Sequence, residues 1–299
     1  MTIYSQINSN KRKTAFIIIG FMMFISFLGY LLGEYYYGYG MGLSVMGTAF
    51  VFSAVSAVSS YFFSDKMVLG ISGAKKADPS RDSALYGIVE NLSIGSGLPK
   101  TPDLYIIDDS APNAFATGRD TKHSAIAVTS GLMQKLNKRQ IEAVLAHEIS
   151  HIKNYDILLM TIVVVLVGSV TMLANFLFRG RLFGSSDSNR SSGGIILLVA
   201  LVLAVISPII AQLIKLAVSR SREYLADASA SLLTRDPDGL AEALAIIAND
   251  PEALEVANEA TAHLYISNPL KKGVNADWFA NLFSTHPPVQ ERISRLRAM

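Results

Sequence analysis

Long runs of hydrophobic residues alternate with mixed polar segments along this chain of 299 residues. Four of the runs match the roughly 20 apolar residues that a helix needs to cross a bilayer. They cover residues 14–33, 41–63, 157–178 and 194–214. The runs fall into two pairs, and this order predicts two transmembrane hairpins.

Basic residues orient the first hairpin. Three of them occupy positions 11–13 before it, four more follow it between residues 66 and 81, and the connection 34–40 has none. Because basic residues are retained on the cytoplasmic side, both ends of this hairpin are predicted to be cytoplasmic. The connection 179–193 carries three arginines. The same rule would not place so many basic residues on the outer side of the membrane. It therefore leaves open whether the second hairpin crosses fully, although we favour four spans.

The polar segments show both helical and strand periodicities. Helices are predicted at residues 80–92, 139–154, 219–233, 238–247 and 288–296, and strands at 103–108, 113–118 and 124–129. Residues 184–194, rich in Ser and Gly, are predicted to be a flexible loop. The chain is thus predicted to be a membrane α-helical protein with an α+β domain, divided into residues 1–63, 64–155, 156–218 and 219–299.

Composition agrees with a membrane protein and narrows the chemistry. Hydrophobic residues make up 51% of the chain and the mean hydropathy is +0.35. A net charge of +2 is too small to indicate nucleic-acid binding. The chain has no cysteine, so disulfides and thiolate ligands are excluded, and any metal site must use histidines and carboxylates.

One short motif carries the chemistry, the sequence His147-Glu148-Ile149-Ser150-His151 within the helix predicted at 139–154. Residues i and i+4 lie on one helix face, where two imidazoles can bind one zinc ion. Glu148 is turned away by about a quarter of a turn. From there it can accept a proton from the attacking water without being a ligand itself.

A catalytic zinc ion needs a third protein ligand. Asn154 and Ile157 occupy the positions of the Gly and the third His of one known arrangement, which is therefore excluded. Glu223 is the best candidate, because an antiparallel second hairpin would return the chain to the membrane face that holds the histidines. Asp227 lies one turn later on the same helix face and is predicted to orient a ligating histidine through its free ring nitrogen.

Residues 143–156 together with 219–230 resemble the HtpX heat-shock membrane metalloproteases, which are related to the prenyl-CAAX endopeptidases. The resemblance covers most of the chain. It implies a zincin fold of gluzincin-like type at the cytoplasmic face of a bacterial inner membrane. It also implies quality control of misfolded or damaged membrane proteins under stress. The ligands implied for the single zinc ion are His147, His151 and Glu223, with Glu148 catalytic.

Two further segments match the pattern of that family. Asn113, Ala114 and Phe115 begin what resembles its edge strand beside the active site, and an exposed strand edge can bind an extended peptide through backbone hydrogen bonds. His286, in a Thr-His-Pro sequence, resembles the family's C-terminal histidine and is expected to donate a hydrogen bond to the oxyanion of the reaction.

Three other functions would each account for part of the sequence. An intramembrane protease is disfavoured by the many charged residues around the motif, and a prenyl-peptide protease is disfavoured only by analogy of length and span count. A membrane scaffold or transporter would explain the spans but not the motif. The expected partners are the lipid bilayer and polypeptide substrates, above all membrane proteins. Self-cleavage is expected in detergent with zinc.

Overall fold

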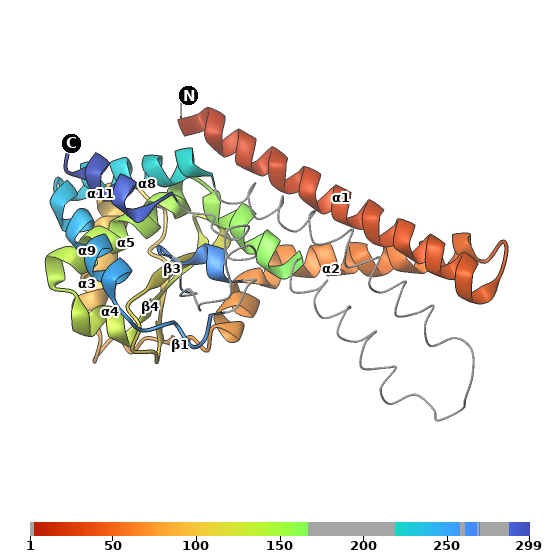
Figure 1. Ribbon diagram of the computed structural model, residues 1–299, viewed down its shortest axis with the longest axis horizontal. Coiled ribbons are helices and arrows are strands. Elements are labelled where there is room, and N and C mark those ends of the chain that lie inside the picture. The colour runs from red at the N-terminus through yellow and green to blue at the C-terminus, as the bar shows by residue number, and fades with distance from the viewer. Residues whose placement is uncertain (1–2, 167–218, 258–260, 268, 270–286) are drawn as a thin grey trace.

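The structure is a computed structural model that describes residues 3–166, 219–257, 261–267, 269 and 287–299. Helices α1 (Ile3–Tyr37) and α2 (Gly42–Ile71) form a long antiparallel hairpin. The hairpin projects away from a body that contains a small sheet and most of the remaining helices (Figure 1). The chain therefore separates a hydrophobic hairpin from the part that carries the motif.

Both helices of the hairpin are candidate membrane spans by length and composition. The candidate spans are Ile7–Tyr35 and Gly42–Ile71, and the apolar 18-residue stretches inside them have mean hydropathies of 2.4 and 1.6. A third candidate arises among the described residues only if Lys138–Lys153 and Asp156–Leu166 count as one span, although the chain bends by 84° between them. The motif helix thus ends at this corner, and the next helix begins at Asp156 in a different direction. Most of residues 157–178, and all of 184–194 and 194–214, lie outside the described residues.

Small residues let α1 and α2 approach closely. A Cβ atom on Gly29 would lie 2.6 Å from the Ala49 Cβ, and one on Gly33 would lie 2.8 Å from the Gly42 Cα. Close backbone approach through glycine is a common way for membrane helices to pack, because lipid offers no hydrophobic driving force between them. At the tip of the hairpin, the Glu34 carboxylate accepts hydrogen bonds from the backbone N–H groups of Gly40 and Gly42.

The sheet of the described chain has four strands in the order β1-β2-β4-β3. They are β1 (Lys75–Lys76), β2 (Asp103–Ile107), β3 (Ala114–Asp120) and β4 (His123–Thr129). Strands β2 and β4 run parallel, and the other two pairs are antiparallel. The three predicted strands are confirmed, whereas the two exposed lysines of β1 carry no hydrophobic pattern that could have predicted it.

Helices cover one face of the sheet and the base of the hairpin covers the other. In β4, Ile126 and Val128 pack into a core with α3 (Ser83–Ser96), α5 (Lys138–Lys153) and α9 (Pro237–Asn249). The alternate residues Ala125 and Ala127 pack against Val68 of α2 and residues 158–166. This two-residue alternation is the side-chain geometry of a strand. The remaining elements are α4 (Ser130–Lys135), α8 (Arg220–Thr234), η1 (Ala262–Leu264) and α11 (Val289–Leu296).

The motif lies on α5, whose two ends are set by local chemistry. Asn137 and Gln140 form a reciprocal capping box at its start, which supplies partners for backbone N–H groups that have none inside the helix. The helix ends at Lys153, and Tyr155 then adopts the left-handed region with a φ of 59°. The corner at residues 154–155 therefore separates α5 from the helix Asp156–Leu166.

Candidate metal centre

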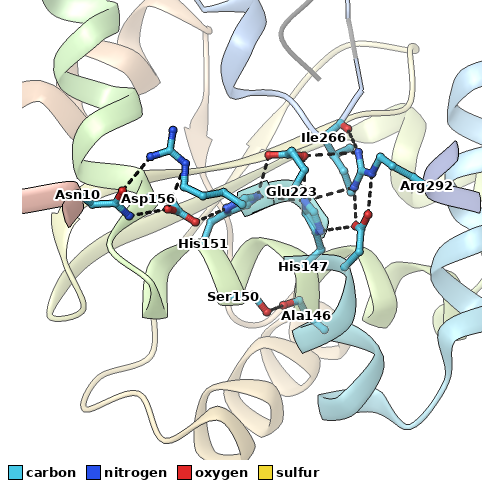
Figure 2. A network of polar contacts seen from close by, with 11 residues as sticks. Asn10, Ala146, His147, Ser150, His151, Asp156, Glu223, Ile266 and Arg292 are labelled. Atoms are coloured by element: carbon cyan, nitrogen blue, oxygen red, sulfur yellow. Dashed lines mark hydrogen bonds and ion pairs between the residues drawn. The ribbon is translucent and has the colours of Figure 1, made fainter. Parts of the chain in front are cut away.

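Helix α5 presents two histidines on one face, as the spacing predicts. The Nε2 atoms of His147 and His151 lie 3.1 Å apart, and their rings are nearly perpendicular, at 88°. Both rings are buried. Two ring nitrogens that point at each other at this distance mark a place where a cation could bind between them (Figure 2).

Glu223 of α8 completes the group. One carboxylate oxygen lies 3.5 Å from His151 Nε2 and the other lies 3.9 Å from His147 Nε2. The three side chains offer ligand atoms that all lie within 4.8 Å of one another. Helix α8 packs directly on α5. The structure thus brings together the three residues that the sequence pattern selected, although they come from two distant segments.

A carboxylate lies behind each imidazole. Asp227 Oδ1 is 3.0 Å from His147 Nδ1, and Asp156 Oδ2 is 3.0 Å from His151 Nδ1. The Asp227 carboxylate also accepts two hydrogen bonds from the Arg292 guanidinium, from Nε at 2.9 Å and Nη2 at 2.7 Å. Carboxylates in these positions direct the Nε2 atoms toward a common point and set the tautomers of the rings.

The electrostatics distinguish the two imidazoles. Burial dominates at His147 and lowers its pKa to about 4. Burial opposes the charged form of His151 as well, but the hydrogen bond to Asp156 and the charge of Glu223 outweigh it and raise its pKa to about 9. At Asp227, the positive charge of Arg292 overcomes burial and lowers the pKa to about 2. A metal ion binds deprotonated ring nitrogens, so metal binding at this pair would compete with a proton.

Glu148 lies on α5 beside this group. It is 2% exposed, and burial raises its pKa to about 7. The backbone N–H of Ala116 in β3 donates to its carboxylate, but its Oε1 atom has no hydrogen-bond partner among the described residues. A buried carboxylate oxygen without a partner is costly unless something else occupies the space beside it.

These observations test whether a metal ion fits. Two neutral imidazole nitrogens and one carboxylate oxygen are ligand types that a catalytic zinc ion takes, with a fourth position left open. Each histidine has a buried carboxylate behind it, as metal-ligating histidines usually do. The buried Glu148 Oε1, which has no hydrogen-bond partner among the described residues, is an acceptor that a water molecule could use. The residues present therefore fit a catalytic metal ion.

Strand β3 lies at the edge of the sheet, as expected, but it is not exposed. Asn113, Ala114 and Phe115 are all buried. The Ala114 carbonyl accepts a hydrogen bond from the backbone N–H of Ile266 at 3.0 Å, and the Phe115 ring packs edge-on against Tyr265. Residues 265–267 cover this end of β3, and the role of the strand in peptide binding stays a prediction.

Sequence reasoning missed four polar residues of the network in Figure 2, which are Asn10, Asp156, Arg222 and Arg292. Asp156 follows His151 by five positions, and this short spacing is the one local signal that could have pointed to it. Arg292 lies on the predicted C-terminal helix, where an arginine normally indicates a solvated face. His286 lies outside the described residues.

The fold and the site together define a class of protein. A hydrophobic hairpin carries a domain in which a His-Glu-x-x-His helix and a glutamate from a second helix surround a place for one metal ion. This arrangement is typical of membrane-bound metallohydrolases.

Comparisons with known proteins refine that class. Residues 79–299 match the family described as "Peptidase family M48". A "Protease HtpX homolog" from Thermoanaerobacter pseudethanolicus is 41% identical over 303 residues, which cover 100% of this chain and 98% of that protein. A "Protease HtpX homolog" from Tropheryma whipplei is 43% identical over 298 residues, which cover 99% and 98%. The crystal structure of S. mikatae Ste24p aligns with a TM-score of 0.49 and 20% identity over 98% of this chain and 66% of that one, a similarity too weak to support an argument.

The chain belongs to peptidase family M48 and, within it, to the HtpX type. It is a membrane metalloprotease, a hydrolase whose substrates are polypeptides. The resemblance that the motif suggested is confirmed.

Proposed function

We propose that the chain is a zinc-dependent endopeptidase in which His147, His151 and Glu223 bind the metal and Glu148 acts as the proton carrier. The observation that supports this assignment most directly is the convergence of the three side chains beside a buried carboxylate whose Oε1 has no hydrogen-bond partner among the described residues. A site of this composition has the groups that hydrolysis of a peptide bond requires.

The metal would be bound by two imidazoles and one carboxylate, a set that favours zinc over Mg²⁺ or Ca²⁺. When bound, zinc supplies Lewis-acid polarisation of the scissile carbonyl group and lowers the pKa of water. Asp227 and Asp156 fix the ring orientations of His147 and His151 through their Nδ1 atoms. Both rings are therefore held for binding before a metal arrives.

Glu148 takes a proton from the attacking water and passes it to the leaving amine. Its pKa, raised by burial to about 7, suits a group that must both accept and release a proton near neutral pH. The helix geometry turns its carboxylate away from the ligand face while keeping it near the metal-binding group. Glu148 can therefore transfer a proton without being a ligand of the metal.

We assign peptide binding to the edge of β3, at Asn113, Ala114 and Phe115. Its position at the end of the strand order supports this role, as does the contact between Ala116 and Glu148, which places the strand beside the proton carrier. An extended substrate can pair with a strand edge through backbone hydrogen bonds alone. Residues 265–267 must then move away from Ala114. The role of His286 in stabilising the oxyanion rests on the resemblance alone.

We further propose that the catalytic part lies at the cytoplasmic face of a bacterial inner membrane and cleaves misfolded or damaged membrane proteins. The basic residues that flank the first hairpin support this orientation, and the role is what the resemblance to the HtpX heat-shock proteases implies. The division into hairpins at 1–63 and 156–218, with a gluzincin-like domain formed from 64–155 and 219–299, belongs to the same proposal. So does self-cleavage, which predicts fragments of the purified chain only when zinc is added.

The test is a proteolysis assay on an unfolded membrane protein with the full chain in detergent, at measured zinc content. Glu148→Gln should lose at least about 100-fold in rate and keep its zinc. Glu223→Ala should lose both. Glu142→Gln, on the same helix but only partly buried, is the matched control. Cleavage by Glu148→Gln at the wild-type rate would refute the proposed mechanism.

A further inference from the structure

Asn10 is a buried polar residue on a helix that otherwise belongs to the membrane hairpin. It is 3% exposed. Its side-chain amide nitrogen donates to Asp156 Oδ1 at 2.7 Å and to the Asn154 carbonyl at 3.2 Å. Its amide oxygen accepts a hydrogen bond from Arg222 Nη1 at 2.8 Å. A single amide from α1 therefore uses both ends on residues that are more than 140 positions away (Figure 2).

Both partners of this amide are neighbours of the metal-binding group. Asp156 uses its other oxygen, Oδ2, on His151 Nδ1 at 3.0 Å. Arg222 precedes Glu223 on α8, and its Nε lies 3.7 Å from Asp156 Oδ1. The Asn10 amide thus connects the carboxylate behind one histidine with the helix that carries the glutamate.

A second contact from α1 reaches the same corner of the chain. Lys11 Nζ lies 4.4 Å from the centroid of the Tyr155 ring. Tyr155 has a φ of 59°, a conformation that side chains other than glycine rarely adopt. Residues 10 and 11 together contact Asn154, Tyr155 and Asp156, the three residues at which the chain bends by 84°. Without such contacts, Asp156 would depend on a strained turn for its position.

We propose that Asn10 is a positioning residue of the metal centre, so that the first membrane helix contributes to the site through its amide. The amide donates to Asp156 Oδ1, which leaves Oδ2 directed at His151, and it accepts from the Arg222 guanidinium of the helix that carries Glu223. This inference rests on the proposed role of His147, His151 and Glu223 as metal ligands. It assigns to α1 a task beyond anchoring the chain in the bilayer.

The test measures zinc affinity of the full chain in detergent by competition with a chromophoric chelator, together with the visible absorption spectrum of the cobalt-loaded chain. Asn10→Ala should bind zinc more weakly, by up to about 10-fold, because Asp156 rather than Asn10 is the direct partner of His151 and loss of a direct partner typically costs about 10- to 100-fold. Asn10→Asp keeps the shape and the acceptor but loses the donor, so it should also weaken zinc binding and alter the cobalt spectrum. Asn8→Ala, an exposed residue of the same helix, should behave as the wild type.

The outcomes separate this inference from the proposed function. Wild-type zinc affinity and an unchanged cobalt spectrum in both Asn10 variants would overturn the positioning role, whatever the protease activity. Failure of both variants to fold, with Asn8→Ala normal, would also overturn it, because it would show that the amide serves the fold as a whole. A wild type that binds zinc and cleaves nothing would refute the proposed function while leaving the positioning role intact.

Discussion

Arg292 offers a sharp test of how the metal centre is held together. The guanidinium is 2% exposed and comes from the short C-terminal helix α11. It donates two hydrogen bonds to Asp227 and one, from Nη1 at 2.9 Å, to the Ile266 carbonyl. We consider the replacement Arg292→Met, which keeps much of the side-chain volume and removes the charge and every donor.

The expected loss of stability follows from the groups that Arg292→Met leaves without a hydrogen-bond partner. Asp227 would remain buried with only His147 as a partner, and removal of one member of a buried ion pair typically costs about 3–5 kcal/mol. The Ile266 carbonyl would lose its bond, which adds about 1 kcal/mol or more if water cannot reach it. We therefore expect a loss of about 4–6 kcal/mol in the free energy of unfolding of the metal-free chain.

The assay is unfolding in mixed detergent micelles with a chelator present, so that metal binding does not contribute. Arg295→Met is the matched control, because that side chain lies on the same helix and is 54% exposed, with Glu291 and the Tyr224 ring as its partners. The control should unfold close to the wild type. The double variant Arg292→Met/Asp227→Asn should recover part of the loss, since it removes both charges. Equal stability of Arg292→Met and Arg295→Met would refute the reasoning.

Three further predictions follow from the same coordinates. Removal of metal with a chelator should abolish proteolysis, and zinc at about 100 times its dissociation constant should restore it and stabilise the fold by about 2.7 kcal/mol, as seen in thermal unfolding. Asp227→Asn should weaken zinc binding by about 10- to 100-fold, because His147 Nδ1 loses its carboxylate at 3.0 Å. Gly118→Ala should destabilise the fold by about 2 kcal/mol or more, since its φ is +139° and a Cβ would lie 2.3 Å from the His123 carbonyl oxygen.

Each of these predictions has an outcome that would contradict it, and each of the two substitutions has a matched control. Activity that survives full metal removal would contradict the first. Asp238→Asn, an exposed aspartate at the start of α9, should leave zinc affinity unchanged, and a loss equal to that of Asp227→Asn would contradict the second. Gly87→Ala, in α3 with nothing within 4 Å of the added Cβ, should instead stabilise the fold by up to about 1 kcal/mol. A neutral Gly118→Ala would contradict the third.

Local periodicity explains why much of the architecture could be predicted. The helix predicted at 139–154 is α5 (Lys138–Lys153), and the strand predicted at 124–129 is β4 (His123–Thr129). Both are determined by side-chain spacing and by caps within a few residues. The end of this helix was predicted to within one residue, but the 84° bend that follows it was not, because the left-handed conformation of Tyr155 has no signal in its residue type.

The closed edge of β3 illustrates a different limit. Its residues resemble an open strand in the sequence, but burial depends on what another segment does. Residues 265–267 reach Ala114 through a contact between positions about 150 apart. A backbone hydrogen bond between segments so far apart in the chain produces no regular hydrophobic spacing in either segment, so it could not be predicted from one sequence.

The sequence by itself determined the metal-binding face, because His147 and His151 are four residues apart and helix geometry alone places them together. It also selected Glu223, since a hairpin between two helices returns the chain to its starting side. Only the tertiary structure decided which groups stand behind those ligands. Arg292 lies 145 positions from His147, and Asn10 lies 146 positions from Asp156. Such contacts arise from the packing of whole helices, which local spacing does not encode.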